Sequence, residues 1–260
     1  MSVVAVASVR SCGVTTLTTG LAMVWPGQRQ RLVVEADPAG ATLAAAAGLA
    51  SEPGLVSLAA AARRDDEPLI ALEHAQPLPG GIAALCGPPS AERARSALTM
   101  LSGLLGRLRE LDADVFVDCG RIEPAASNAT YLEHADLGVL AVRPRLADLH
   151  ALGSFLQNRT ERLQPSALVL IGSGPYPGGE VADALGVRVA GQIPWDPDAA
   201  QALASTSIDS RQLTRRPLVR ALRTLADDLA NGVAPASAEA PVASATATEN
   251  GHVSAIEAGP

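Results

Sequence analysis

The chain has 260 residues, which allows one large domain or two small ones. Hydrophobic residues make up 48% of it and aromatic residues only 2%, so a core must be built from Ala, Val and Leu rather than from large rings. The net charge of −7 argues against a broad nucleic-acid-binding surface, although a local basic patch is compatible with it.

Short apolar runs alternate along the chain with longer periodic segments rich in Ala and Leu. The runs are expected to form strands at 3–8, 31–36, 81–86, 114–119, 137–142, 167–172 and 188–193. The periodic segments are expected to form helices at 15–24, 54–64, 90–110, 147–162, 197–205 and 213–230. Several runs are continuously apolar, which is typical of parallel strands covered on both faces. The alternation therefore predicts an α/β fold, a doubly wound and mostly parallel sheet with helices on both faces.

The last periodic segment, 213–230, carries one apolar stripe with arginines on the opposite face. This pattern predicts a helix docked on the core, and a pair of aspartates near its end argues against the alternative, a helix bound to an anionic membrane. The stripe consists of Leu218, Leu222, Leu225 and Leu229. Residues 232–260 are rich in Ala, Pro, Ser, Thr and Glu and too poor in bulky apolar residues to build a core. We expect one domain over residues 1–231 and a disordered tail over 232–260.

The sequence has no recognisable signal for export or membrane insertion. Its start lacks a basic segment followed by a long apolar one, and no apolar run approaches the roughly 20 residues of a membrane span. The cysteines Cys12, Cys86 and Cys119 are widely spaced and do not have the spacing of metal ligands. We expect a cytoplasmic protein with reduced thiols.

The first strand, turn and helix have the layout of a phosphate-binding P-loop. Aligned with G-x-x-x-x-G-K-[ST], Ser8 stands at the first glycine, Gly13 at the last glycine, Val14 at the lysine and Thr15 at the metal-binding hydroxyl. All twenty basic residues of the chain are arginine, so no lysine from elsewhere can take the place of the missing one. This stretch alone is equally compatible with an ordinary strand-to-helix turn.

Four further strand-end segments support the nucleotide interpretation. They are LVVEADPAGA (32–41), DADVFVDCGR (112–121), ADLGVLAVRPRLADL (135–149) and VAGQIPWDPDAAQALAS (189–205). Together with the first turn, and in this order, they resemble the ParA/MinD family of deviant-Walker ATPases over about residues 1–230. The chain looks most like the divergent actinobacterial branch whose loop reads G-V-T-T rather than G-K-T-T. The resemblance implies a P-loop NTPase fold and a site for ATP or ADP with Mg²⁺.

The resemblance also implies a role for individual residues. Thr15, with Thr16 beside it, matches the hydroxyl that binds Mg²⁺, and Asp118 matches the metal-side Walker B aspartate. Asp37 matches the switch aspartate that positions the attacking water. Residues of the loop itself match the phosphate cradle, and two residues of the segment 194–198 match the part that lies along the base. These nucleotide-binding candidates are Arg10, Ser11, Cys12, Gly13, Val14, Thr15, Thr16, Pro194 and Asp196.

The departures from the family pattern affect charge. Val14 replaces the P-loop lysine, and Val9 replaces the signature lysine that reaches the partner subunit's nucleotide in the family. Arg10 and Ser11, which lie between Val9 and Val14, occupy two positions that are glycine in the family pattern. Removing one preorganised donor from a charged transition state costs roughly 10²–10³ in rate, so we expect weak or absent ATP hydrolysis. Backbone amides and the helix dipole do not depend on side chains, so weak nucleotide binding can survive.

Three functions are compatible with the sequence. The first is a ParA/MinD-like positioning or assembly protein that acts through protein partners. Those partners would account for any membrane association. A homodimer of this protein, if it forms, is not driven by ATP. The second is an active ATPase in chromosome partition, division-site placement or pilus and secretion assembly, with Arg10 or Arg143 compensating for the lysine. The third is a metabolic enzyme such as an ATP-dependent ligase, for which the segment after Asp118 offers only Arg121 and Glu123.

Overall fold

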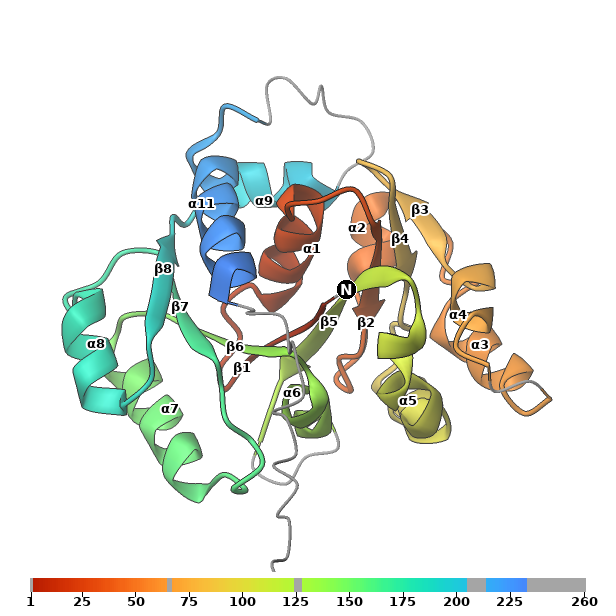
Figure 1. The fold of residues 1–260 in the computed structure, drawn as a ribbon, viewed down its shortest axis with the longest axis horizontal. Coiled ribbons are helices and arrows are strands. Elements are labelled where there is room, and N and C mark those ends of the chain that lie inside the picture. Colours follow the sequence, from red (N-terminus) through yellow and green to blue (C-terminus); the bar gives the residue numbers. More distant parts are fainter. Residues whose placement is uncertain (1, 65–66, 124–127, 205–213, 233–260) are drawn as a thin grey trace, which may run out of the picture.

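In the computed structural model, which describes residues 2–64, 67–123, 128–204 and 214–232, the chain folds around one eight-stranded sheet (Figure 1). The strands follow the order β3-β4-β2-β5-β1-β6-β7-β8. They are β1 (Val3–Ser8), β2 (Gln30–Glu35), β3 (Gln76–Leu78), β4 (Ile82–Leu85), β5 (Ala113–Arg121), β6 (Leu137–Val142), β7 (Ala167–Ile171) and β8 (Val189–Ile193). All pairs are parallel except the edge pair β3–β4. The predicted doubly wound, mostly parallel sheet is confirmed.

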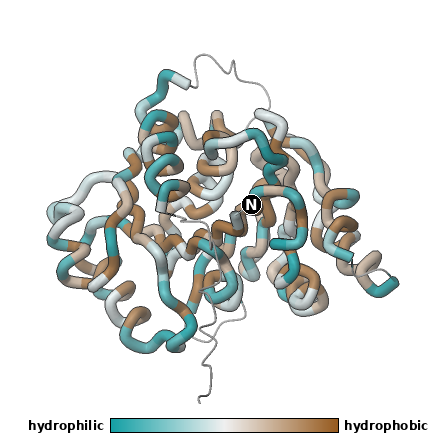
Figure 2. Tube along the Cα trace, viewed as in Figure 1, coloured by the Kyte–Doolittle hydropathy of each residue, from teal (hydrophilic) through white to brown (hydrophobic). Residues whose placement is uncertain are grey.

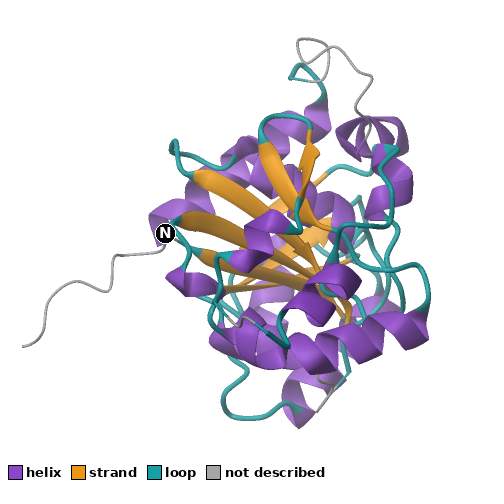
Figure 3. Ribbon diagram, turned by 90° about the vertical axis from the view of Figure 1, so that its right-hand side faces the viewer, coloured by secondary structure: helices purple, strands orange, loops and turns teal. Residues whose placement is uncertain are grey.

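Helices cover both faces of this sheet, as Figure 3 shows from the side. One face carries α1 (Val14–Val24), α2 (Leu43–Ala47), α9 (Pro197–Ala204) and α11 (Pro217–Gly232). The other carries α3 (Leu55–Ala61), α5 (Ala91–Gly106), α6 (Ala129–His134), α7 (Leu146–Asn158) and α8 (Gly178–Leu185), with α4 (Ile70–Glu73) and a 3₁₀ turn (Leu108–Glu110) beside them. None of the described helices is long and apolar enough to span a membrane. Except for Gly232, which ends α11, the predicted tail over 232–260 lies outside the described residues.

The sequence prediction found every element longer than eight residues and missed five of the shorter ones. The unpredicted elements are β3, α2, α4, α6 and α8. Each has eight residues or fewer, too few for a clear apolar period, and α8 buries only Val181.

The core forms two layers, one on each side of the sheet. Val4 and Val6 of β1 point into one layer, whereas Val3, Ala5 and Ala7 point into the other. This alternation follows from the pleat of a strand, and it explains why the central strands are apolar throughout (Figure 2).

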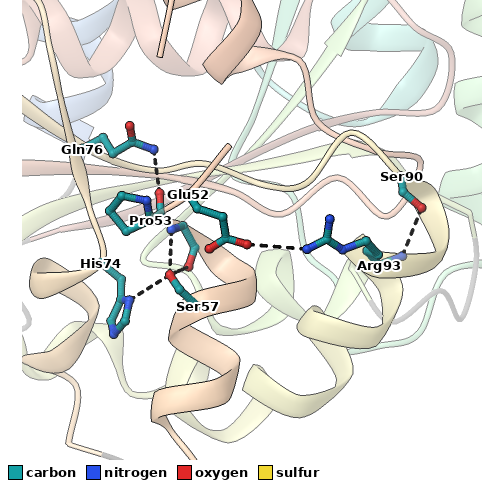
Figure 4. Close-up of polar contacts among 8 residues, drawn as sticks. Glu52, Pro53, Ser57, His74, Gln76, Ser90 and Arg93 are labelled. Atoms are coloured by element: carbon teal, nitrogen blue, oxygen red, sulfur yellow. Dashed lines mark hydrogen bonds and ion pairs between the residues drawn. The ribbon is translucent and has the colours of Figure 1, made fainter. Parts of the chain in front are cut away.

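The corner before α3 is fixed by polar contacts to the edge of the sheet (Figure 4). Gln76 Nε2 donates to the carbonyl oxygen of Pro53 at 2.6 Å. Ser57 Oγ lies 2.9 Å from His74 Nδ1 and bonds both backbone groups of Gly54. These bonds hold the start of α3 against the carboxyl end of β4, where the Leu55 amide donates to the Cys86 carbonyl oxygen.

The predicted stripe of α11 is buried, which confirms a helix docked on the core: Leu218, Leu222, Leu225 and Leu229 are all 2% exposed or less. Its neighbour is α1, and a glycine permits their close approach. A Cβ atom on Gly20 of α1 would lie 2.5 Å from Leu222 Cδ1, so Leu222 occupies the space that a side chain at position 20 would need.

We expect Gly20→Ala and Leu222→Ala to be coupled rather than additive. Leu222→Ala should lower the free energy of unfolding by about 2–5 kcal/mol, because it leaves a cavity. Gly20→Ala should lower the stability of the parent by about 1–3 kcal/mol through overpacking, but should raise it in the Leu222→Ala background, where the methyl group has room. Urea denaturation of the parent, both single variants and the double variant measures the coupling.

The matched control is Gly103→Ala in α5, because a Cβ atom there meets nothing within 4 Å. It should stabilise the protein by up to about 1 kcal/mol, the helix-propensity gain of alanine over glycine. An equal effect of Gly20→Ala in both backgrounds would contradict the proposed packing.

Candidate nucleotide-binding site

The turn between β1 and α1 has the shape of a P-loop. Gly13 precedes the helix in a left-handed conformation with φ 99°, a region that a residue with a side chain rarely adopts. Its carbonyl oxygen accepts the Leu17 amide at 3.0 Å, so the helix is hydrogen-bonded from its first turn. The free N–H groups of that turn therefore face the carboxyl edge of the sheet, as phosphate binding requires.

Valine side chains occupy both lysine positions and pack inward. Val14 is 6% exposed and belongs to the core layer under α1, α9 and α11. Val9 is half-buried against the opposite layer. Neither position delivers a charge to the loop.

The two predicted aspartates come together at the carboxyl ends of β2 and β5. A Cβ atom on Gly120 would lie 2.1 Å from Asp37 Cγ, so the Asp37 side chain lies directly on the backbone that follows Asp118. The Gly120 amide donates to Asp118 Oδ1 at 2.9 Å, and the Ala39 amide donates to Asp37 Oδ1 at 2.7 Å. Thr15 is the third member of this group, because its hydroxyl interacts with the Asp118 carboxyl.

Burial keeps these carboxyl groups unusually weak as acids. It raises the pKa of Asp118 to about 6, and the charge of Asp37 adds to the rise, while the Thr15 hydroxyl and the Gly120 amide oppose it. Burial also raises the pKa of Asp37, although its own hydrogen bond from Ala39 and the charge of Arg121 act in the other direction.

The residues present fit a Mg²⁺ ion. Asp118 Oδ2 and Ser8 Oγ are buried and have no hydrogen-bond partner among the described residues, so each has a free lone pair. Mg²⁺ prefers one or two carboxylates or hydroxyls together with water and phosphate oxygens, and Asp118 with Thr15 can supply the protein's share. In the described part of the chain no three His, Cys, Asp or Glu residues form a cage that would hold a metal by themselves.

Glu35, which the sequence analysis passed over, is the most heavily hydrogen-bonded carboxylate of the site. Its Oε1 accepts the amides of Thr42 and Leu43, each at 2.8 Å, and its Oε2 accepts the Gly87 amide at 3.1 Å. Burial nevertheless raises the pKa of Glu35 to about 7. The hydrogen bonds from the Leu43 and Thr42 amides lower this pKa, and the charge of Asp118 raises it further. The only sign of this role in the sequence was one acidic residue at the end of an apolar strand. Glu35 fixes the segment after Asp37 to the end of β4.

The two arginines proposed to compensate for lysine lie in different places. Arg10 Nε is 3.8 Å from Asp148 Oδ1, so this exposed side chain extends toward α7. The Arg143 guanidinium carbon lies 5.1 Å from the centroid of the Trp195 ring. Its charge also lowers the pKa of the Cys12 thiol in the loop, although burial dominates and raises that pKa to about 11. Arg143 is therefore the arginine that remains close to the loop without an acidic partner among the described residues.

A small apolar groove lies where the base is expected. The structure brings Pro194 and Asp196 beside Cys12, Gly13 and Thr16, with α11 as the far wall. The groove encloses about 80 Å³, well below the ~300 Å³ of small ligand sites. Asp196 Oδ1 accepts the Ala199 amide at 3.0 Å and so caps α9. Ser11, by contrast, is exposed on the α7 side.

We expect Asp118→Asn to stabilise the protein above neutral pH, because a carboxyl whose folded-state pKa is raised favours folding only while it is protonated. The contribution of the Asp118 carboxyl to the free energy of unfolding is lost as the pH rises from about 4 to 6. The variant should be more stable than the parent by roughly 2–3 kcal/mol at pH 7.5 and by clearly less at pH 5, at about 1.4 kcal/mol per pKa unit. Urea denaturation at both pH values checks this, with exposed Asp112→Asn as the control. Equal effects of Asp118→Asn at the two pH values would contradict a raised pKa.

No protein-family model and no curated protein matches the sequence. Solved structures do match the fold. The ParA family ATPase from Chlorobium tepidum TLS has a TM-score of 0.65 at 17% identity, covering 86% of this chain and 98% of its own. The septum site-determining protein MinD complexed with Mg-ADP from Pyrococcus horikoshii OT3 has a TM-score of 0.63 at 20% identity, covering 89% and 99%.

The MinC:MinD cell division protein complex of Aquifex aeolicus has a TM-score of 0.56 at 14% identity, covering 89% of this chain and 96% of the matched one. At these identities the similarity identifies the fold. The sheet order, the left-handed glycine before α1 and these matches together show that the chain has the ParA/MinD-like fold of the P-loop NTPases.

Proposed function

We propose that the chain is a ParA/MinD-like positioning or assembly protein that hydrolyses ATP weakly or not at all and acts through protein partners. The observation that carries this proposal is the burial of Val14. The residue at the lysine position is part of the core, and the sequence contains no lysine that could replace it. The similar Aquifex MinD structure is a complex with MinC, which supports action through a partner protein.

The charge balance of the site supports the same proposal. Glu35, Asp37 and Asp118 are three carboxyl groups at the carboxyl ends of β2 and β5, beside the loop. Of the arginines at this edge, Arg10 pairs with Asp148. Arg121 offsets the charge of Asp37. Arg143 is stacked on Trp195. While Arg143 stays there, nucleotide phosphates would rely on backbone amides and on a helix dipole worth about half a unit charge.

The valine at position 9 affects how the protein is expected to form a homodimer. A residue without charge cannot contribute the cross-subunit contact that its position makes in the family, so any homodimer is expected to form without ATP. Val9 also packs against the protein's own core layer. Sedimentation that detects a dimer only with ATP and Mg²⁺ would argue against this part of the proposal.

The alternative, an active ATPase with a remodelled loop, is favoured by one observation. Asp37, Asp118 and Thr15 are still arranged as a metal and water site, and the similar Pyrococcus MinD structure contains Mg-ADP. In that case Arg143 is the better replacement for the lysine, because Arg10 is engaged by Asp148.

Steady-state ATP hydrolysis separates the two proposals. We expect turnover at least 10²-fold below that of a ParA/MinD ATPase with both lysines measured in the same buffer, because one preorganised charge is worth roughly 10²–10³. Asp37→Ala, which removes the proposed switch carboxylate, should then leave the residual rate unchanged. Turnover within tenfold of the reference, lost in both Asp37→Ala and Arg143→Ala, would establish the active ATPase instead.

A further inference from the structure

One exposed aromatic and two cationic side chains lie beside the site, at the carboxyl ends of β6, β7 and β8. We call Arg143, Arg145 and Trp195 the Trp195 patch. Trp195 is 58% exposed, a value that large apolar side chains rarely reach in this structure. A hollow of about 400 Å³ opens between Trp195 and the two arginines, with its floor formed by 171–173.

Some surface arginines of this protein pair with a carboxylate. Arg188 lies 2.6 Å from Asp228, and Arg10 lies near Asp148. In the described part of the chain, neither Arg143 nor Arg145 forms an ion pair with a carboxylate. Arg145 is exposed and Arg143 is half-buried beside Trp195, on a protein whose net charge is −7.

The patch is held in place before any partner arrives. The Arg143 guanidinium stacks over the Trp195 ring, an attraction between a cation and an aromatic face. The floor is hydrogen-bonded to β8, because Gln192 Nε2 donates to the Gly172 carbonyl oxygen at 2.7 Å and the Gly172 amide donates to Ile193 at 2.8 Å. A preorganised surface loses little entropy when it binds.

We infer that the Trp195 patch docks an acidic segment of a partner protein, in which a carboxylate enters the hollow between the two arginines and an apolar side chain lies on Trp195. Guanidinium forks match carboxylates, and Trp and Arg are the residues most enriched at the energetic centre of protein interfaces. A short acidic segment needs only the two guanidinium groups, whereas an extended polyanion such as DNA or an anionic membrane would also meet the rest of a surface whose net charge is −7. This inference rests on the proposed action through partners and names the chemistry of one partner.

The position of Trp195 links the patch to the nucleotide groove. Its side chain lines both the hollow and the small groove beside Cys12 and Gly13. A segment bound to the patch would therefore contact the wall of the candidate base site.

Selection from a random peptide library displayed on phage tests the inference with the full-length protein and without nucleotide. Excess soluble Arg145→Gln/Trp195→Ala double variant competes away peptides that bind elsewhere. We expect the surviving peptides to be richer than the input library in Asp and Glu next to a large apolar residue. A surviving pool without acidic enrichment, or no survivors, overturns the inference.

The affinity of the most enriched synthetic peptide then provides the second measurement. Arg145→Gln and Trp195→Ala should each weaken binding about tenfold or more, the loss expected for one charged hydrogen bond or one interface anchor. The control variants are Arg29→Gln and Met100→Ala, at exposed positions outside the patch. They should leave the affinity for the peptide unchanged. Equal losses in patch and control variants overturn the inference, and thermal unfolding of each variant confirms that it is folded.

Phosphatidylserine vesicles and a mixed-sequence DNA duplex serve as the competing ligands. Binding of either that is lost in Arg145→Gln assigns the patch to a polyanion and overturns a protein partner. ATP turnover is measured on the same preparations. Rapid turnover would refute the proposed weak ATPase and leave the docking result standing, whereas a failed selection would leave the turnover result standing.

Discussion

The burial of α1 is the constraint on which the rest of the site depends. The helix packs against the sheet, α9 and α11, and its buried residues begin at Val14. Thr18 and Thr19 are buried too, and Thr18 Oγ1 donates to the Val14 carbonyl oxygen. With the helix fixed this tightly, the chain can reach it from β1 only through the left-handed turn at Gly13. The backbone amides of the loop are thereby directed at the carboxyl edge, whatever side chains the loop carries.

This constraint separates the shape of a nucleotide site from its charge. The shape comes from the backbone and from packing, and it is retained here. The charge comes from side chains, and here valine at position 14 joins the core while three carboxyl groups remain at the strand ends. Asp118 is buried there and its Oδ2 has no hydrogen-bond partner among the described residues.

The strands of the sheet and most of the candidate site residues could be predicted from the sequence. Continuous apolar runs located the strands, and the resemblance to the ParA/MinD family singled out Thr15, Asp37 and Asp118, which lie together in the structure. The antiparallel edge strand β3 has only three residues and was too short to detect. Glu35 was overlooked because its role depends on amides at positions 42, 43 and 87, which only the folded chain brings to it.

The directions of the arginines could not be predicted either. Both Arg10 and Arg143 follow strands that end at the site, so the sequence treats them alike. Their orientations are decided by Asp148 on α7 and by Trp195 after β8, residues distant in the chain. The same contacts created the Trp195 patch, which becomes visible only when the burial of each side chain is known.

The central claim is that the P-loop of this protein retains its shape and has lost its charge. Calorimetric titration of the purified protein with ATP, with and without Mg²⁺, tests it most directly. The account predicts binding at least about tenfold weaker than that of a lysine-containing ParA/MinD ATPase under the same conditions, because one charged hydrogen bond of about 1.5–3 kcal/mol is missing. Binding of Mg-ATP as tight as in that reference protein would contradict it.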